Sequence, residues 1–290
     1  STLEEDLYWY SDRADSRLKA LRSSIVRELS ENNDSPLKNK ITIGEDKAFL
    51  TSPPFGDSLS KCGLLPKAKG NQYLQESTIF SLYDVNNHDH NSEMIKTKKK
   101  IVKLLIKCYS LAGEYFKENL FDSNSLIVTN RGTHPFIMLI GDLVRHLIKQ
   151  DSVSNQSSID TIFDGIEKYL RCLLEKLVSL SEDEKAKYLG MLGAGVETKW
   201  LRFFQSVIHG CFSEYYPEDL VDWQQRQDEA LQDEGRKYGE KIESFMKKTI
   251  LDNLKILFGN EWEFEIGKIA RECQNRASLE DEKNYKEGLK

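Results

Sequence analysis

The sequence lacks any apolar run long enough to cross a bilayer. A membrane-spanning helix needs about 18 or more consecutive apolar residues, and no stretch of the chain approaches that length. The first residues, STLEEDLYWY, are acidic and aromatic, unlike a signal or transit peptide. They also lack an initiator methionine, so we expect the chain to be a piece of a longer protein. These absences predict a cytoplasmic protein with no membrane partner.

Cysteine is scarce and widely spaced. The five cysteines form no CxxC pair and no dense framework, and their number is odd. This usage is typical of reduced thiols in a cytoplasmic protein. The two histidines of NHDHN have no third ligand at a telling spacing, so we interpret that stretch as an exposed polar loop and predict no metal. The cysteines are Cys62, Cys108, Cys172, Cys211 and Cys273.

Familiar enzyme signatures are also missing. The chain contains no G-x-S-x-G, no Walker A string and no H-E-x-x-H. We therefore predict no cofactor and, for this chain alone, favour a non-catalytic role. The net charge of −6 argues against a wholly basic nucleic-acid binder but leaves room for a local basic patch.

Helical periodicity dominates what is present. Hydrophobic residues make up 39% and charged residues 30%, a balance typical of a folded, helix-rich chain. KITIG and KAFLTS predict two short strands around a turn, and the chain from 53 to 70 is loop-like. The predicted fold is mainly α, a multi-helix domain with a minor β-hairpin near the N-terminus. Helices are expected at 13–31, 93–119, 135–149, 158–180, 182–189, 196–214, 218–257 and 265–287.

A polar segment, DSVSNQSS, is the best candidate for an internal boundary. It predicts a helical region at 1–150, which contains the hairpin and a basic helix. A second region, at 158–290, would contain long amphipathic helices, with Gly235 and Gly239 as places where the 218–257 helix bends or breaks. One continuous domain is the alternative.

Three stretches, taken in order, resemble a known family. They are a helix that runs into ENNDSPLKNKITI, the run NSLIVTNRGTHPFIMLIGDLV, and the ending GNEWEFEIGKIARECQNRA after a long charged helix. Together they resemble the region downstream of the namesake motif in bacterial DGQHR-domain proteins. That family includes regulators linked to DNA phosphorothioation, and its members often occur among phage-defence genes.

The string DGQHR itself does not occur in this chain. No functional residue of the family is therefore carried over to a position here. The resemblance implies that the chain is the carboxy-terminal portion of a larger protein of DNA modification or antiviral defence, with a defence-system protein as an expected partner.

A stripe of lysines along one helix is the strongest candidate for a binding surface. Its five lysines fall within an arc of about 100° at 100° per residue, opposite the apolar face of the 93–119 helix. Such a stripe suits the phosphate backbone of DNA or RNA, because lysine neutralises charge and releases counterions. An ordinary solvated helix face is the alternative. The stripe consists of Lys96, Lys99, Lys100, Lys103 and Lys107.

The stretch TNRGTHPF, residues 129–136, suggests a second phosphate site. Backbone N–H groups at a helix start attract anions, and Arg131 stands beside them. The alternative is a simple capped helix start, with Thr133 as N-cap and His134 and Pro135 in the first turn.

Two residues on one face suggest the only specific catalytic alternative. Arg202 and His209 are separated by six residues, which resembles the R-x(4–6)-H signature of HEPN ribonucleases. The resemblance implies RNA cleavage, with His209 as general acid or base and Arg202 holding phosphate. Phe203 and Phe204 follow the arginine where that signature usually carries a strong polar residue.

The glycine-rich stretch GMLGAGVETKW follows a helix and not a strand. Phosphate-binding glycine loops follow strands, so we interpret this one as a bend. Gly190 is expected as a left-handed C-cap, with Gly193 and Gly195 reversing the chain. Beyond the bend, Lys199 and Arg202 are candidate phosphate contacts.

The leading hypothesis is a non-catalytic helical domain of a DNA-modification or phage-defence protein that supports nucleic-acid binding or assembly. The alternatives are a HEPN-like ribonuclease and a module for self-association or partner docking without a nucleic-acid role.

Overall fold

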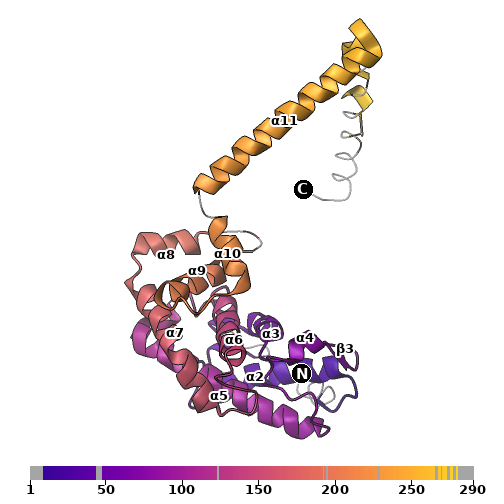
Figure 1. Cartoon of the computed structure of the whole chain (residues 1–290). Helices are drawn as coiled ribbons and strands as arrows, with labels where there is room; N and C mark the ends of the chain where they lie inside the picture. Colours follow the sequence, from indigo (N-terminus) through magenta and orange to yellow (C-terminus); the bar gives the residue numbers. More distant parts are fainter. Residues whose placement is uncertain are drawn as a thin grey trace. The chain divides into compact units, whose positions relative to one another are not determined.

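The computed structural model describes residues 9–43, 48–122, 124–191, 193, 195–226, 229–264, 267–268, 270–272, 275–276 and 279. The chain divides into two compact units, residues 1–221 and 222–290. Helices make up most of both units, so the predicted mainly α fold is confirmed (Figure 1). Among the described residues, no helix combines the length and apolar character that crossing a membrane requires.

The first unit is a packed array of helices. α5 packs against α2 and α7, and α6 packs against α3, α7 and α9. The helices of this unit are α2 (Ala14–Glu31), α3 (Ser52–Lys61), α4 (Gln75–Thr78), α5 (His90–Phe116), α6 (Thr133–Lys149), α7 (Ile159–Ser179), α8 (Glu182–Leu189) and α9 (Val196–Cys211), with a 3-10 helix at Lys117–Phe121. α10 (Glu218–Gln225) begins in this unit and ends beyond its limit.

Amphipathic periodicity explains the core. On α5 the predicted apolar face, which includes Ile101, Leu104, Leu105 and Cys108, is fully buried. Each large apolar side chain removed from water contributes about 1.5–3 kcal/mol, so these helices are held mainly by packing. Two free thiols, Cys62 and Cys108, lie inside this core.

The predicted β-hairpin is wrong in which strands form it. β1 (Ile41–Thr42) and β2 (Leu50–Thr51), the strands expected around a turn, pair parallel with Ile41 opposite Leu50. The antiparallel hairpin is formed instead by β3 (Ala68–Lys69) and β4 (Gln72–Tyr73). The turn between them begins with Gly70, whose φ of 60° favours glycine.

Helix α3 also departs from prediction, since its residues were expected as strand and loop. Its second and third residues are Pro53 and Pro54. Proline is tolerated in a first turn because the N–H groups there have no intrahelical partner. The helix then buries Phe55 and Leu59 against the core.

The predicted boundary at 151–158 lies inside the first unit. α6 and α7, on either side of it, pack against each other. The division falls instead after Val221, within α10.

The second unit contains α11 (Glu229–Phe258), followed by a 3-10 turn at Gly259–Glu261. Gly235 and Gly239 lie inside the continuous α11, so neither breaks it. In place of the single expected 218–257 helix, the described residues form α10, which ends at Gln225, and α11, which begins at Glu229. Most of the helix expected at 265–287 lies outside the described residues.

The glycine-rich connection between α8 and α9 bends as predicted, but its glycines adopt other backbone conformations than expected. Gly190 caps α8 in a right-handed conformation, with φ −75°, so the expected left-handed C-cap is wrong. Gly193 and Gly195 have φ of 95° and 87°, and Gly195 is the N-cap of α9. Left-handed backbone favours glycine at these two positions.

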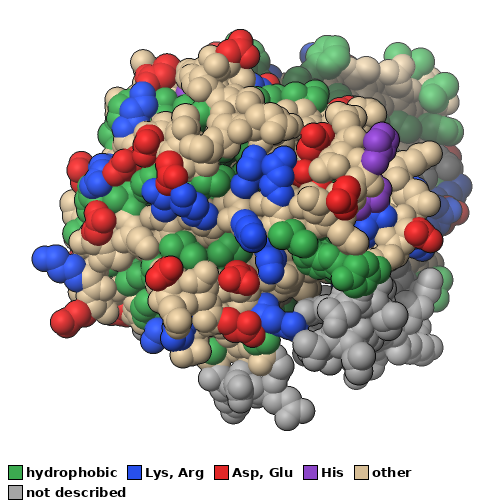
Figure 2. Space-filling model, turned by 90° about the horizontal axis from the view of Figure 1, so that it is seen from below, with side chains coloured by type: hydrophobic (Ala, Val, Ile, Leu, Met, Phe, Trp, Pro, Cys, Tyr) green, Lys and Arg blue, Asp and Glu red, His purple; other side chains and the backbone are tan. Residues whose placement is uncertain are grey.

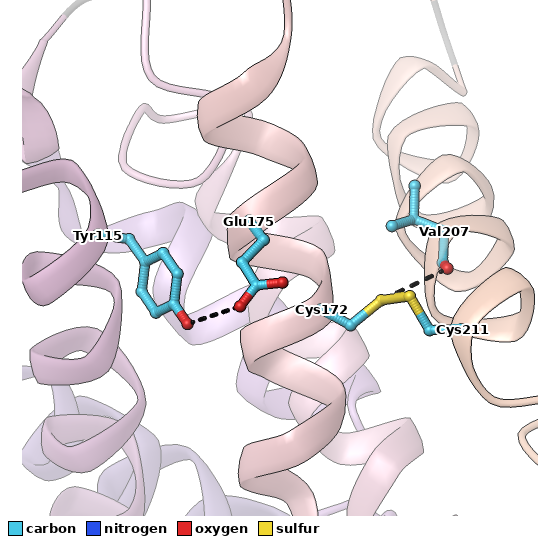
Figure 3. The surroundings of a disulfide bond; sticks show 5 residues. All are labelled: Tyr115, Cys172, Glu175, Val207 and Cys211. Carbon is cyan, nitrogen blue, oxygen red and sulfur yellow. Dashed lines mark hydrogen bonds between the residues drawn. A yellow bond between two sulfur atoms is a disulfide. The ribbon is translucent and has the colours of Figure 1, made fainter.

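Two cysteines predicted as free thiols form a disulfide. Cys172 of α7 and Cys211, the last residue of α9, are bonded, with Cα atoms 6.7 Å apart (Figure 3). Sγ of Cys172 also lies 3.7 Å from the carbonyl oxygen of Val207. On the other side of α7, the Tyr115 hydroxyl donates to Glu175. The prediction was wrong because the two cysteines are 39 residues apart, and the sequence does not show that α7 and α9 lie side by side.

Candidate functional site

A polar cleft lies between α6 and α9, next to the loop that leads into α10. α6 contributes four polar residues at spacings of three, four and seven, which places them on one helix face. The cavity has a volume of about 150 Å³. We call it the α6–α9 cleft; its lining includes Asp142, Arg145, His146 and Lys149 of α6, Arg202 and Gln205 of α9, and Tyr215 and Glu218.

A chain of hydrogen bonds holds two arginines in this cleft. Arg145 donates to Oδ1 of Asp142 over 3.1 Å, and Nε2 of Gln205 donates to Oδ2 of the same carboxylate over 2.7 Å. Oε1 of Gln205 in turn accepts from Arg202 over 2.8 Å. Because Gln205 is almost fully buried, the chain fixes both guanidinium groups relative to each other.

Tyr215 lies against these groups and is buried, with 1% of its surface exposed. Its hydroxyl makes no hydrogen bond of acceptable geometry. Burial raises the pKa of this hydroxyl far above the ordinary tyrosine value, so it remains a proton donor at neutral pH. The cleft therefore holds a buried donor without an acceptor.

His146 packs beside Tyr215, edge-on to the rings of both Tyr215 and Tyr169. Burial lowers the pKa of His146; Glu214 partly opposes that shift, and Lys168 and Lys149 reinforce it. The imidazole is thus neutral at pH 7. At the rim, Lys149 pairs with Glu218 over 3.2 Å.

The proposed ribonuclease pair has two different environments. Arg202 lines the α6–α9 cleft, whereas His209 contacts the loop beyond it: its Nδ1 lies 2.9 Å from the carbonyl oxygen of Tyr215. That contact requires a proton on Nδ1, and the imidazole also packs on the ring of Tyr216. A joint catalytic role for Arg202 and His209 stays a prediction.

The lysine stripe of α5 is largely occupied by contacts within the fold. Lys103 and Lys107 both pair with Asp160 in the first turn of α7, and Lys100 donates to the backbone carbonyl of Asn155. Lys96 pairs with Glu93.

Lys99 of the stripe has an exposed side chain. A cavity of about 460 Å³ beside the stripe is lined by Lys98, Lys99, Lys103 and Lys107, and also by the carboxylates Glu28 and Asp34. Figure 2 shows basic and acidic side chains interspersed over the face of the molecule that it presents.

The start of α6 differs from both sequence interpretations. Its N-cap is Gly132 and not Thr133, whose backbone N–H donates to the carbonyl of Thr129. Arg131 donates to the carbonyl of Met191 in the α8–α9 connection, over 3.0 Å. His134 contacts the hydroxyl of Ser58 on α3. These side chains therefore position α6, α3 and the connection; they do not converge on one anion site.

Lys199, the remaining predicted phosphate contact, lies exposed in the first turn of α9. It does not line the α6–α9 cleft, where Arg202 lies one turn further along the same helix. Their role as phosphate contacts stays a prediction.

Sequence reasoning missed most of the α6–α9 cleft. Its signal is present in GDLVRHLIK, where Asp142, Arg145, His146 and Lys149 share one helix face opposite the buried leucines. Without knowledge of the partner helix, such a face cannot be told from an ordinary solvated one. Within the described residues, no group of three or more His, Cys, Asp or Glu is arranged to hold a metal.

A second candidate surface lies on α11, considered within its own unit. Twelve positions without a charged side chain occupy an arc of about 140° at 100° per residue, and they run almost the length of the helix. Its large side chains are exposed, from 47% for Leu231 to 80% for Ile256. We call this the α11 seam: Leu231, Gly235, Tyr238, Gly239, Ile242, Phe245, Met246, Thr249, Ile250, Asn253, Ile256 and Leu257.

Comparison with models of protein families, with curated proteins and with solved structures found no match. The resemblance to DGQHR-domain proteins stays a prediction. The α6–α9 cleft and the α11 seam are therefore the features that bear on function.

Proposed function

We propose that this chain is a self-associating protein, and that two copies pair through their α11 seams. The single observation that carries the proposal is the seam itself. A helix of 30 residues spans about 45 Å and displays an uninterrupted uncharged face along most of that length.

The seam has the size that a dimer needs. Seven of its large apolar side chains are more than half exposed. With the leucine at its start, they present apolar area on the order of 900 Å². A typical monomer has no apolar patch above roughly 300–600 Å², whereas a stable interface buries about 800 Å² on each partner. The seven are Tyr238, Ile242, Phe245, Met246, Ile250, Ile256 and Leu257.

The order of side chains along the seam favours an antiparallel pair. Its narrow part, at Gly235 and Gly239, lies toward the start of α11, and bulky residues lie toward its end. Suppose that Ile242 of one copy faces Phe245 of the second. The glycines near the start of each α11 then pack against the large side chains near the end of the other α11. Such a two-fold contact uses the same surface on both copies and closes without forming a filament.

The oligomeric state of the full chain tests the proposal. Sedimentation or light scattering over a range of concentrations should show a reversible dimer for wild type. Ile242→Glu places a charge in the seam and should give monomer, because a buried unpaired carboxylate is costly. Ser244→Glu adds the same charge two residues away, on the opposite face, and should leave the dimer intact.

A monomeric wild type at all concentrations, or equal loss of the dimer in both variants, would overturn the proposal. The first outcome is also the one expected if another part of the same chain covers the seam. Orientation is tested with Leu231→Cys in a Cys273→Ser background, because only a parallel pair brings two copies of position 231 together.

Nucleic-acid binding through the α5 stripe is not the function that we propose. Lys100, Lys103 and Lys107 would have to leave partners within the fold to reach a phosphate backbone. Glu28 and Asp34 beside them would repel that backbone.

A further inference from the structure

We infer that a cavity between α2 and α3 binds a small organic phosphate, a phosphomonoester whose organic group is partly apolar. The inference is independent of self-association, because every residue that lines the cavity belongs to the first unit. The cavity has a volume of about 390 Å³. We call it the α2–α3 cavity; its lining includes Asp15, Leu18, Arg22, Lys61, Pro66 and Lys67.

Three elements bring these residues together. α2 packs against both α3 and β3. Asp15, Leu18 and Arg22 follow one another at spacings of three and four along α2, so they share one face of that helix. Lys61 is the last residue of α3, and Lys67 directly precedes β3. The cavity therefore lies where the end of α3 and the start of β3 meet one face of α2.

The charge of the lining favours an anion. Three cations line the cavity against one carboxylate, that of Asp15. This carboxylate is already bound: Arg13 donates to its two oxygens over 3.1 and 2.8 Å, and the backbone N–H of Gly70 donates to one of them over 2.9 Å. Asp15 therefore does not neutralise the cations of the cavity. These cations are Arg22, Lys61 and Lys67.

The same three cations are available to a ligand. Within the described part of the chain, the guanidinium group of Arg22 and the ammonium groups of Lys61 and Lys67 make no hydrogen bond or ion pair. The carboxylate of Asp57 attracts Arg22, but it lines the neighbouring cavity and forms no ion pair with that arginine. The positive charge of the α2–α3 cavity therefore exceeds what its described surroundings neutralise.

The burial of Arg22 gives a second argument. The two lysines are exposed to water, whereas Arg22 is half-buried. Burial lowers the pKa of Arg22, and the charge of Asp57 opposes that shift only in part. Because a guanidinium group stays protonated at neutral pH, a charge with five N–H donors lies partly out of water without an acceptor. A bound oxyanion would supply acceptors to these donors and offset the cost of desolvation.

Charge and size together select a phosphomonoester. Such a group has three terminal oxygens as acceptors and a charge of about −1.5 to −2 at pH 7, which matches an excess of two positive charges in the lining. A volume of about 390 Å³ lies within the range of small-molecule sites, about 300–1,000 Å³, so it leaves room for an organic group. Leu18, Pro66 and Leu74 supply apolar surface for that group.

Calorimetric titration of the full chain with phenyl phosphate tests the inference, with inorganic phosphate and phenol as separate arms. Wild type should bind phenyl phosphate more tightly than inorganic phosphate, and it should not bind phenol. Binding should weaken as the ionic strength rises, because the attraction is between charges near the surface. Equal affinities for the two phosphates would overturn the assignment of an organic ligand.

Arg22→Gln should weaken the binding of phenyl phosphate at least tenfold, because it removes the half-buried charge and its donors. Thermal unfolding without ligand should be unchanged or occur at a slightly higher temperature, since a partly desolvated charge is lost. Phenyl phosphate should raise the unfolding temperature of wild type more than that of the variant. A purely structural arginine would show the reverse: a lower unfolding temperature without ligand and an unchanged affinity.

Lys67 and Lys69 provide a matched pair of variants. Both lysines are exposed, and of the two only Lys67 belongs to the described lining of the cavity. Lys67→Gln should weaken binding about two- to fivefold, as expected for an exposed charge, whereas Lys69→Gln should leave the affinity unchanged. Absence of phenyl phosphate binding in wild type, or equal binding by wild type and Arg22→Gln, would overturn the inference.

Discussion

Lys103 of α5 donates to Asp160 of α7 over 2.6 Å. Lys107, one turn further along α5, reaches the other oxygen of the same carboxylate over 2.9 Å. Hydrogen bonds from both lysines hold the pKa of Asp160 below its ordinary value. A stripe that resembles a phosphate-binding surface in the sequence thus helps to attach α7 to α5.

The first prediction separates these two roles. Lys103→Glu places a carboxylate against Asp160 and should lower the unfolding temperature by a few degrees. Lys99→Glu, on the same stripe and exposed, should leave that temperature unchanged. Retention on DNA at low salt provides the comparison: a backbone-binding stripe would lose retention in both variants alike.

The second prediction concerns the disulfide. Cys172 and Cys211 are 39 residues apart, and closing a loop of that length stabilises a chain by about 3–4 kcal/mol. Urea unfolding with and without a reductant should reveal a loss of that size. For the double variant Cys172→Ala, Cys211→Ala, the free energy of unfolding should be the same with and without the reductant. Denatured wild type should gain two titratable thiols on reduction, and a constant thiol count would contradict the bond.

The third prediction is a pH dependence at Glu93, which is fully buried at the start of α5. Burial alone would raise its pKa, but hydrogen bonds from the Asp84 backbone, Asn87 and Thr97, with the charge of Lys96, place the pKa below the ordinary value. Stability from this site is therefore fully present above about pH 4.3, the unfolded value, and is lost as the pH falls through the lower folded value.

Glu93→Gln should cost about 1–3 kcal/mol at pH 7, because charge-assisted hydrogen bonds are weakened. The free-energy difference from wild type should shrink as the pH falls below 4. Urea unfolding of both proteins from pH 7 to pH 3 provides the measurement. A difference that stays constant over that range would show that ionisation of Glu93 is not responsible.

The fourth prediction tests the contact between α3 and α6. A Cβ at Gly141 would overlap the carbonyl oxygen of Cys62. Gly141→Ala should therefore destabilise the protein by about 1–3 kcal/mol, although alanine is the better helix former. Gly210→Ala on α9, where a Cβ meets nothing within 4 Å, should be neutral or stabilising by up to about 1 kcal/mol. Equal changes in stability in the two variants would mean that helix propensity alone determines the effect of alanine, and that the contact with Cys62 contributes nothing.

Local patterns predicted most of the helices because their periodicity is a property of each segment. The expected 182–189 helix matches α8, and the apolar face of α5 is buried as expected. α3 was missed because Pro53 and Pro54 suggest a loop unless their place in a first turn is known. The parallel pairing of β1 with β2 depends on how the intervening chain returns, which strand patterns alone do not contain.

The candidate site was harder to predict, because it depends on which helices become neighbours. Arg202 was singled out for a pairing with His209, whereas the structure shows it donating to Gln205, one turn away. Asp142 joins it from α6, and Tyr215 joins it from the loop that follows α9. The same dependence on neighbours explains why the disulfide, and the engagement of the lysine stripe, could not be foreseen.

The two buried thiols give the protein an internal reporter of its own opening. Burial raises the pKa of Cys62 to about 12 and that of Cys108 still further, so neither reacts as a thiolate in the folded state. In a Cys273→Ser background, the rate at which these two residues accept a thiol label therefore measures how often the helices around α3 and α5 separate. Opening events can thus be timed without introducing a new cysteine.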